Sequence, residues 1–283
     1  MKTPGGLRPR TPHLDLVDNL ADRVRDTWAS RFSGSGVELP LSAIGALTQV
    51  RGPDPQAAKD AFLDLSVDQA AHVLRLLWSR FGSMRPDLVY RVLPLARWTH
   101  GTGEHDQQAT LVAVARTAVK AGLFDLTMNA QTRMSVDVFG PVLMTLRPKK
   151  ACERNGQFYT PVDTATLLAY GLGAPEPSAS VHESSVGTGA LILAFAEHAR
   201  AQGRDPADMH WDLVDIDPIA TACLAVNVDL WRLGPNVLIG CGDVLADDWR
   251  ERALYERDLG IQIQRWQPLY RLISAPHRYA SAA

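Results

Sequence analysis

The chain has 283 residues, of which 46% are hydrophobic, so it is long and apolar enough to bury two cores and does not have the composition of a disordered chain. Its 29 basic and 31 acidic residues leave a formal net charge of −2, which gives no overall electrostatic case for a polyanionic partner. The three cysteines lack metal-type spacing, and no window approaches about 18 uninterrupted apolar residues. We therefore expect a soluble cytoplasmic protein with no membrane segment and no metal site.

The first half of the chain has helical periodicity. Apolar residues such as Val17, Val24 and Trp28 recur at three- and four-residue steps, which predicts an amphipathic helix. Ser66 and Gln69 have the spacing of a capping box and predict the start of another helix. Further helical patterns cover residues 41–50, 55–64, 86–98, 106–124 and 134–146, and no strand pattern intervenes. We predict an all-helical domain over residues 1–150.

The pattern changes after residue 155. Short apolar runs that end in acidic or glycine-rich turns alternate with helical patterns, which is typical of βαβ units and a parallel sheet. We predict helices at 161–172, 189–202 and 218–233 and strands at 179–184, 211–216 and 236–242. A weaker helix at 247–257 and a final strand at 269–274 follow. The predicted class is α/β, with an incomplete Rossmann-like domain over residues 151–283 after the helical one.

Two turns at the ends of the predicted strands favour a nucleotide-type ligand. Gly187 and Gly189 follow the first strand, where missing side chains let a ligand approach the backbone and let helix and strand pack closely. Asp215 ends the second strand, where a carboxylate can accept hydrogen bonds from ribose hydroxyls. An ordinary tight turn explains the glycines equally well. Asp217 precedes Pro218 and is better explained as a helix cap.

Two further segments can be explained in two ways. Asp243 follows the third strand, where its carboxylate can accept from an exocyclic amine while Val244 packs on a ring, or where it caps the next helix. The segment from Gly156 to Pro161 places Phe158 and Tyr159 either beside a ligand or in a hydrophobic staple ahead of a helix capped by Thr160. The basic residues Arg147, Lys149, Lys150 and Arg154 before it fit a phosphate contact or a solvated linker.

In this order, the segments Gly156 to Pro161, Glu183 to Gly189, Asp215 to Pro218, and Gly242-Asp243 resemble the motifs of adenine-N6 DNA methyltransferases. The likeness is greatest to the modification subunits of type I restriction systems, which also place a helical domain before the methyltransferase domain. The resemblance covers residues 155–245 well and the helical half only in outline. It implies methylation of adenine N6 in DNA, S-adenosylmethionine as the cofactor, DNA as a partner, and a specificity or complementing subunit.

The resemblance also implies the cofactor contacts, residue by residue. The methionine part of the cofactor would lie against Gln157, Phe158, Tyr159, Thr160 and Pro161. The turn after the first strand would be lined by Glu183, Ser185, Val186, Gly187 and Gly189. Asp215, with Ile216 beside it, would hold the ribose, and Asp243, with Val244 beside it, would contact the adenine.

The catalytic motif of such enzymes, Asn/Asp-Pro-Pro-Tyr/Phe after a fourth strand, is absent from the sequence. In that motif, acceptor atoms orient the amine of a flipped adenine while the aromatic ring stacks on the base. The best positional substitute follows the predicted final strand and gives Ser274, Pro276 and His277 as degraded candidates. A serine hydroxyl is a poorer acceptor than a carboxylate or an amide. Three interpretations remain open: a truncated or decayed methyltransferase, one part of a split enzyme, and a non-catalytic cofactor-binding or interaction module.

Overall fold

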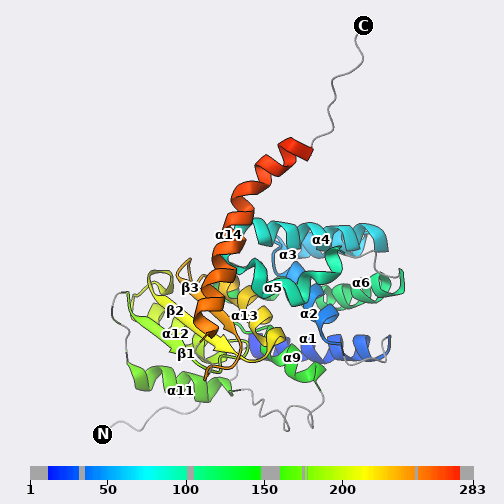
Figure 1. The fold of residues 1–283 in the computed structure, drawn as a ribbon. Helices are drawn as coiled ribbons and strands as arrows, with labels where there is room; N and C mark the ends of the chain where they lie inside the picture. Colours follow the sequence, from blue (N-terminus) through cyan, green and yellow to red (C-terminus); the bar gives the residue numbers. More distant parts are fainter. Residues whose placement is uncertain are drawn as a thin grey trace.

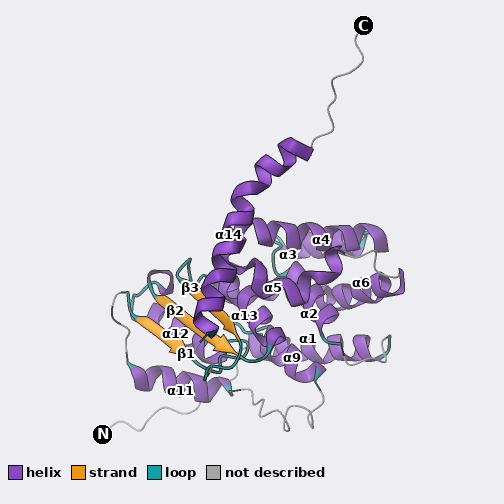
Figure 2. Cartoon of the chain, in the orientation of Figure 1, coloured by secondary structure: helices purple, strands orange, loops and turns teal. Residues whose placement is uncertain are grey.

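A helical region stands beside a smaller α/β region in the computed structural model, which describes residues 12–31, 36–100, 105–147, 160–173, 176, 178–245 and 248–274 (Figure 1). The helical region contains α1 (Pro12–Ala29), α2 (Glu38–Leu47), α3 (Pro55–Leu63), α4 (Val67–Met84), η1 (Pro86–Leu88), α5 (Val89–Ala96), η2 (Arg97–His100), α6 (His105–Lys120), α7 (Leu123–Thr127), α8 (Ala130–Arg133) and α9 (Phe139–Leu146). Figure 2 shows the strands gathered in one part of the molecule.

The helical patterns predicted for the first half are confirmed, except that residues 134–138 of the predicted segment 134–146 are not helical and α9 begins at Phe139. The apolar stripe of α1, from Val17 to Trp28, is buried in the hydrophobic core. Helix α4 begins with the predicted capping box, in which the Gln69 backbone N–H donates to Ser66 Oγ at 3.2 Å and the Ser66 backbone N–H donates to Gln69 Oε1 at 2.9 Å. These two bonds satisfy backbone donors that a helix start leaves without partners.

The α/β region follows the predicted alternation. Helix α11 (Val162–Leu172) precedes β1 (Ser180–Glu183), and α12 (Ala190–Ala201) and η3 (Pro206–Asp208) lead to β2 (His210–Asp215). Helix α13 (Pro218–Leu230) then leads to β3 (Val237–Cys241). The strands form a parallel sheet in the order β1-β2-β3, in which Val181 pairs with Trp211 and Trp211 with Val237. The carboxyl ends of the strands therefore meet at one edge of the sheet.

The predicted final strand at residues 269–274 is wrong, because one helix, α14, runs from Trp249 to Ser274. The predicted short helix at 247–257 is the start of α14. A short apolar run fits a buried strand and a helical segment equally well, so periodicity alone could not separate them. Ser274, a catalytic candidate from the sequence, therefore ends a helix and not a strand, and Figure 1 shows this helix leading away from the sheet.

Glycines allow α14 to pack closely against both regions. A Cβ added at Gly240 of β3 would lie 2.5 Å from Trp249 Cε3, and one added at Gly260 would lie 2.2 Å from the carbonyl oxygen of Pro86 in η1. Side chains at either position would force the elements apart. Helix α14 therefore connects the sheet to the helical region.

The helical and α/β regions share a continuous hydrophobic core. The Trp231 indole N–H at the end of α13 donates to the Val136 carbonyl oxygen at 2.9 Å, and Arg51 forms an ion pair with Asp229 at 3.2 Å. These contacts join segments from the two sides of residue 150. The domain boundary at that residue stays a prediction. None of the described helices is long and apolar enough to cross a membrane.

Candidate functional site

A hollow of about 350 Å³ lies at the carboxyl ends of the strands. Its walls come from α9, the turn after β1, the turn after β2, and the starts of α12 and α13. It is lined by Gly140, Leu143, Met144, Arg147, Thr160, Glu183, Ser185, Val186, Gly187, Thr188, Ala190, Leu191, Asp215, Ile216, Asp217 and Ala220. This edge of an open parallel sheet is where α/β proteins bind their ligands.

The two glycines of the turn after β1 have different surroundings. Gly187 lines the hollow with φ of 56°, and a Cβ added to it would meet nothing within 4 Å. Gly189 has φ of 100°, and an added Cβ would lie 2.7 Å from Leu224 Cδ1 and 2.8 Å from Trp231 Cζ3. Gly187 therefore leaves room for a ligand, whereas Gly189 lets the turn pack closely on α13.

Asp215 holds the turns after β1 and β2 together. Its Oδ2 accepts from the Gly187 backbone N–H at 2.7 Å, and its Oδ1 accepts from the Asp217 backbone N–H at 2.9 Å. A carboxylate offers about four lone-pair sites, so acceptor capacity remains beyond these two bonds. Asp215 thus has a structural role as well as a position at the rim of the hollow.

Asp217 caps α13, as predicted, with Pro218 at the first helical position. Its Oδ1 accepts from the Ile219 backbone N–H at 2.9 Å, and its Oδ2 pairs with the Arg147 guanidinium. Burial on its own would raise the pKa of Asp217, but the hydrogen bond and charge of Arg147 and two backbone N–H donors outweigh it, so the pKa lies below its ordinary value. Arg147 therefore holds a negative charge in place at the hollow.

A buried polar network connects the glycine turn to the helical region. The Asp137 carboxylate accepts from the Gly140 backbone N–H at 3.0 Å, from the Thr188 hydroxyl at 3.3 Å and from the Asn227 amide at 3.3 Å. The Asn227 amide also donates to the Thr188 carbonyl oxygen at 2.9 Å. Asp137, Thr188 and Asn227 are all buried, so loss of any member would leave polar groups without partners.

Most of the sequence-predicted cofactor residues that the structure describes line the hollow. Thr160, Glu183, Ser185, Val186, Gly187, Asp215 and Ile216 do so, and Gly189 supports the turn from behind. Asp243 lies at the same edge of the sheet but is exposed, and its Oδ1 accepts from the Leu245 backbone N–H at 2.9 Å. Asp243 and Val244 are not in the walls of the hollow. Gln157, Phe158, Tyr159, Pro276 and His277 lie outside the described residues.

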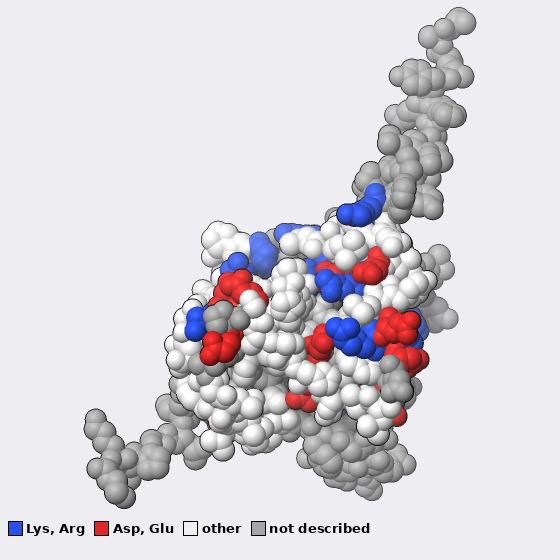
Figure 3. Space-filling view, turned by 60° about the vertical axis from the view of Figure 1, so that its left-hand side comes forward, with Lys and Arg blue, Asp and Glu red and all other residues white. Residues whose placement is uncertain are grey.

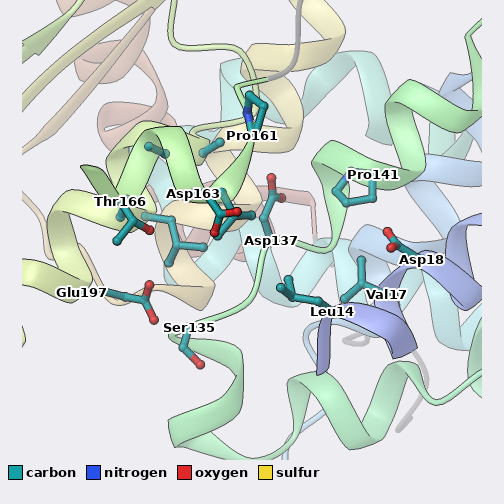
Figure 4. A pocket seen from close by; sticks show the side chains of 15 residues that line it. Leu14, Val17, Asp18, Ser135, Asp137, Pro141, Pro161, Asp163, Thr166 and Glu197 are labelled. Atoms are coloured by element: carbon teal, nitrogen blue, oxygen red, sulfur yellow. The ribbon is translucent and has the colours of Figure 1, made fainter. Parts of the chain in front are cut away.

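Pro161 lies at a second hollow, also of about 350 Å³, between α1, the start of α9, α11 and α12. Helix α11 begins at Val162 with no side-chain cap, one residue later than predicted, so Thr160 does not cap it. Figure 4 shows carboxylates, among them those of Asp137, Asp163 and Glu197, around this hollow. Asp137 therefore borders the second hollow and also bonds to the glycine turn of the first.

Sequence reasoning missed the wall that α9 contributes. Gly140, Leu143, Met144 and Arg147 line the hollow, although they lie before the predicted boundary at residue 150. Only Arg147 gave a signal, as part of the basic cluster before the aromatic turn.

On the face drawn in Figure 3, basic and acidic residues are interspersed, so the described residues of that face form no continuous positive surface.

Parallel strands, an open glycine turn and an acidic residue at the end of β2 meet at the end of the sheet where many α/β proteins bind nucleotide-type ligands. Residues 135–260 match the family model described as N-6 DNA Methylase. This matched segment includes all the residues that line the hollow.

One solved structure similar to this chain is the type I restriction-modification system methyltransferase subunit from Streptococcus thermophilus. The two are 14% identical in sequence, with a TM-score of 0.46. The match covers 83% of this chain, and this chain spans 60% of the length of that structure. No curated protein matches the chain.

Proposed function

We propose that the hollow at the carboxyl ends of the strands binds S-adenosylmethionine and that the chain serves N6 methylation of adenine in DNA. The observation that carries the proposal is the convergence of the open Gly187 backbone, the Asp215 carboxylate and the exposed Ile216 side chain around one hollow within the family segment. By this proposal the protein works on DNA in the cytoplasm.

The residues present fit a nucleoside cofactor. Asp215 retains acceptor sites for ribose hydroxyls, and Ile216, which is 71% exposed, offers an apolar surface to the adenine ring. Gly187 permits close approach to the backbone, and Glu183 supplies an acceptor at the end of β1. The bound cofactor would supply an electrophilic methyl group on a sulfonium sulfur, and the carboxylates of Glu183 and Asp215 would favour its positive charge.

Binding without methyl transfer is the second candidate function. It is favoured by α14, because the residues expected to form a catalytic strand are helical and leave the sheet. Among the residues that the structure describes, no strand beside β1 brings acceptor groups for a flipped adenine to the hollow. The two candidate functions use the same cofactor site and differ only in whether the methyl group of the cofactor is transferred to a base.

Isothermal titration of the full chain with S-adenosylmethionine tests the cofactor site. We expect saturable binding that weakens at least tenfold in Asp215→Asn, which loses a charge and an acceptor, and is unchanged in Asp212→Asn. Asp212 lies on the same strand, pairs with Arg250 and is outside the hollow. Equal binding by wild type and Asp215→Asn would remove the proposed ribose contact.

Methyl transfer needs a separate experiment. The full chain is incubated with S-adenosylmethionine labelled in the methyl group and with DNA of mixed sequence. Incorporation at adenine N6 supports methyl transfer by this chain. Binding without incorporation favours the second candidate.

A further inference from the structure

A charged basin of about 740 Å³ lies at the amino ends of β2 and β3, at the other end of the sheet from the hollow proposed for the cofactor. Its walls come from the ends of α4, α12 and α13, from η1 and η3, and from the turn before β3. A volume of this size is in the range of small-molecule sites. The charged side chains of this arginine basin belong to Arg85, Arg200, Arg204, Arg232, Asp87, Asp205 and Asp229.

The three aspartates of the arginine basin already have partners in the protein. Asp87 accepts from the Arg85 guanidinium through both carboxylate oxygens, at 3.0 and 2.7 Å. Asp229 forms an ion pair with Arg51 at 3.2 Å. The Oδ1 atom of Asp205 accepts from the backbone N–H two residues later at 2.9 Å and so caps η3. Arginines therefore neutralise two of the carboxylates, and the three other arginines of the basin face one aspartate.

Two of these three arginines are available to a ligand. Arg200 has a structural role, because its guanidinium donates to the carbonyl oxygens of Met134, at 3.3 Å, and of Trp231. Arg204 and Arg232 are exposed, and within the described part of the chain their guanidinium groups form no hydrogen bond and no ion pair. Each guanidinium offers five N–H donors in a planar fork that fits two oxygens of a phosphate group.

Arg232 stands at a backbone position that favours glycine. Its φ is 53°, in the left-handed region, just after the end of α13. The Leu233 backbone N–H donates to the Val228 carbonyl oxygen at 3.1 Å and the Arg232 backbone N–H to the Asp229 carbonyl oxygen at 3.2 Å, which is the pattern of a helix end that usually carries glycine at this residue. A side chain here costs backbone stability, and such costs recur at functional sites. A cation near a helix end also gains from the helix dipole, and a stability measurement separates the two roles.

The arginines around the basin repel one another. Burial lowers the pKa of Arg133, and the positive charge of Arg232 lowers it further. Burial also lowers the pKa of Arg51; the charge of Asp229 opposes this shift, whereas the charges of Arg133 and Arg80 add to it. A bound anion with several charges would offset this repulsion.

We propose that the arginine basin binds a compact polyphosphate group, such as that of a free nucleotide, through the guanidinium groups of Arg204 and Arg232. The several charges of a polyphosphate match a cluster of arginines, and guanidinium groups bind phosphate oxygens in pairs. The volume of the basin suits a small molecule. A base that received the methyl group would lie at the other end of the sheet, so the basin is not placed to hold the proposed DNA substrate. The inference goes beyond the proposed function, and a failure of cofactor binding would leave it standing.

Titration with inorganic triphosphate tests the proposal. The wild-type full chain, the double variant Arg204→Gln/Arg232→Gln and the control Arg23→Gln/Arg31→Gln are compared by isothermal titration at one ionic strength. The control removes the same charge from exposed arginines outside the basin. Citrate serves as a polyanion without phosphate. Thermal unfolding checks that each variant is folded, and S-adenosylmethionine titration of the same samples reports separately on the cofactor site.

We expect saturable binding of triphosphate to wild type, at least tenfold weaker binding to the double variant, and unchanged binding to the control. Arg232→Gly should also bind at least tenfold more weakly, while its melting temperature does not fall below that of wild type, because glycine suits the left-handed backbone. A lower melting temperature for Arg232→Gly would assign Arg232 to the helix end and overturn the proposal. It would also be overturned by no binding to wild type, by equal binding to the double variant, by citrate binding as tightly as triphosphate, or by displacement of triphosphate by a short DNA duplex.

Discussion

Substitution of the two turn glycines separates ligand access from packing. Both have positive φ, which costs an alanine about 1–2 kcal/mol. At Gly189 the added Cβ also meets Leu224 and Trp231 below 3.0 Å, and overpacking of this kind costs about 1–3 kcal/mol more. Gly189→Ala should therefore lower the free energy of unfolding by about 2–5 kcal/mol, whereas Gly187→Ala should lower it by only about 1–2 kcal/mol.

The binding effects should rank in a different way from the stability effects. Gly187 lines the hollow and an added Cβ there would occupy open space, so we expect S-adenosylmethionine to bind at least tenfold more weakly to Gly187→Ala, a loss of about 1.4 kcal/mol. Gly203 provides the control, because it has φ of 75° and open space around it but does not line the hollow. Gly203→Ala should cost as much stability as Gly187→Ala and leave binding unchanged.

Urea unfolding and isothermal titration measure the two effects on the same samples. The reasoning is refuted if Gly187→Ala binds as tightly as wild type, or if Gly189→Ala is no less stable than Gly203→Ala. The first result would place the ligand away from the turn. The second would mean that the turn does not pack on α13 as described.

Three further predictions concern the surroundings of the hollow. Because the pKa of Asp217 is lowered, the contribution of this carboxylate to stability is present above about pH 4 and is lost as the pH falls through the folded-state pKa. In Arg147→Met the guanidinium no longer offsets the effect of burial, so the pKa of Asp217 should rise. Urea unfolding should then show that the free energy of unfolding begins to fall at a higher pH than in wild type. Asp137→Ala should cost about 2–4 kcal/mol in unfolding free energy and weaken S-adenosylmethionine binding, and a stable variant with full binding would contradict this. Gly260→Ala should lower the melting temperature by several degrees, because its Cβ meets the carbonyl of Pro86; an unchanged melting temperature would contradict the contact.

Local sequence signals predicted the parts of the fold that depend on short-range chemistry. The capping box at Ser66, the cap at Asp217 and the three parallel strands each rest on residues a few positions apart, and all are confirmed. The glycines at 187 and 189 could be assigned to the turn but not distinguished. Their difference depends on Leu224 and Trp231, which are distant in sequence.

Long-range packing explains what the sequence could not predict. The pairing of Arg147 with Asp217 and the network around Asp137 join the two halves of the chain, and neither partner carries a local signal for the other. The run from Leu269 to Ser274 was assigned to a strand, whereas it continues a helix that starts at Trp249. Helix α14 packs on Gly240 of β3 through Trp249 and on Pro86 of η1 through its own Gly260, and such contacts are invisible in a local window.

A crystal structure of the full chain grown with S-adenosylmethionine tests the central claim most directly. The account predicts the cofactor in the hollow beside Gly187, with its ribose hydroxyls within hydrogen-bond distance of the Asp215 carboxylate and its adenine against Ile216. Cofactor density at the second hollow, lined by Asp163 and Glu197, or an absence of cofactor at saturating concentration, would contradict it.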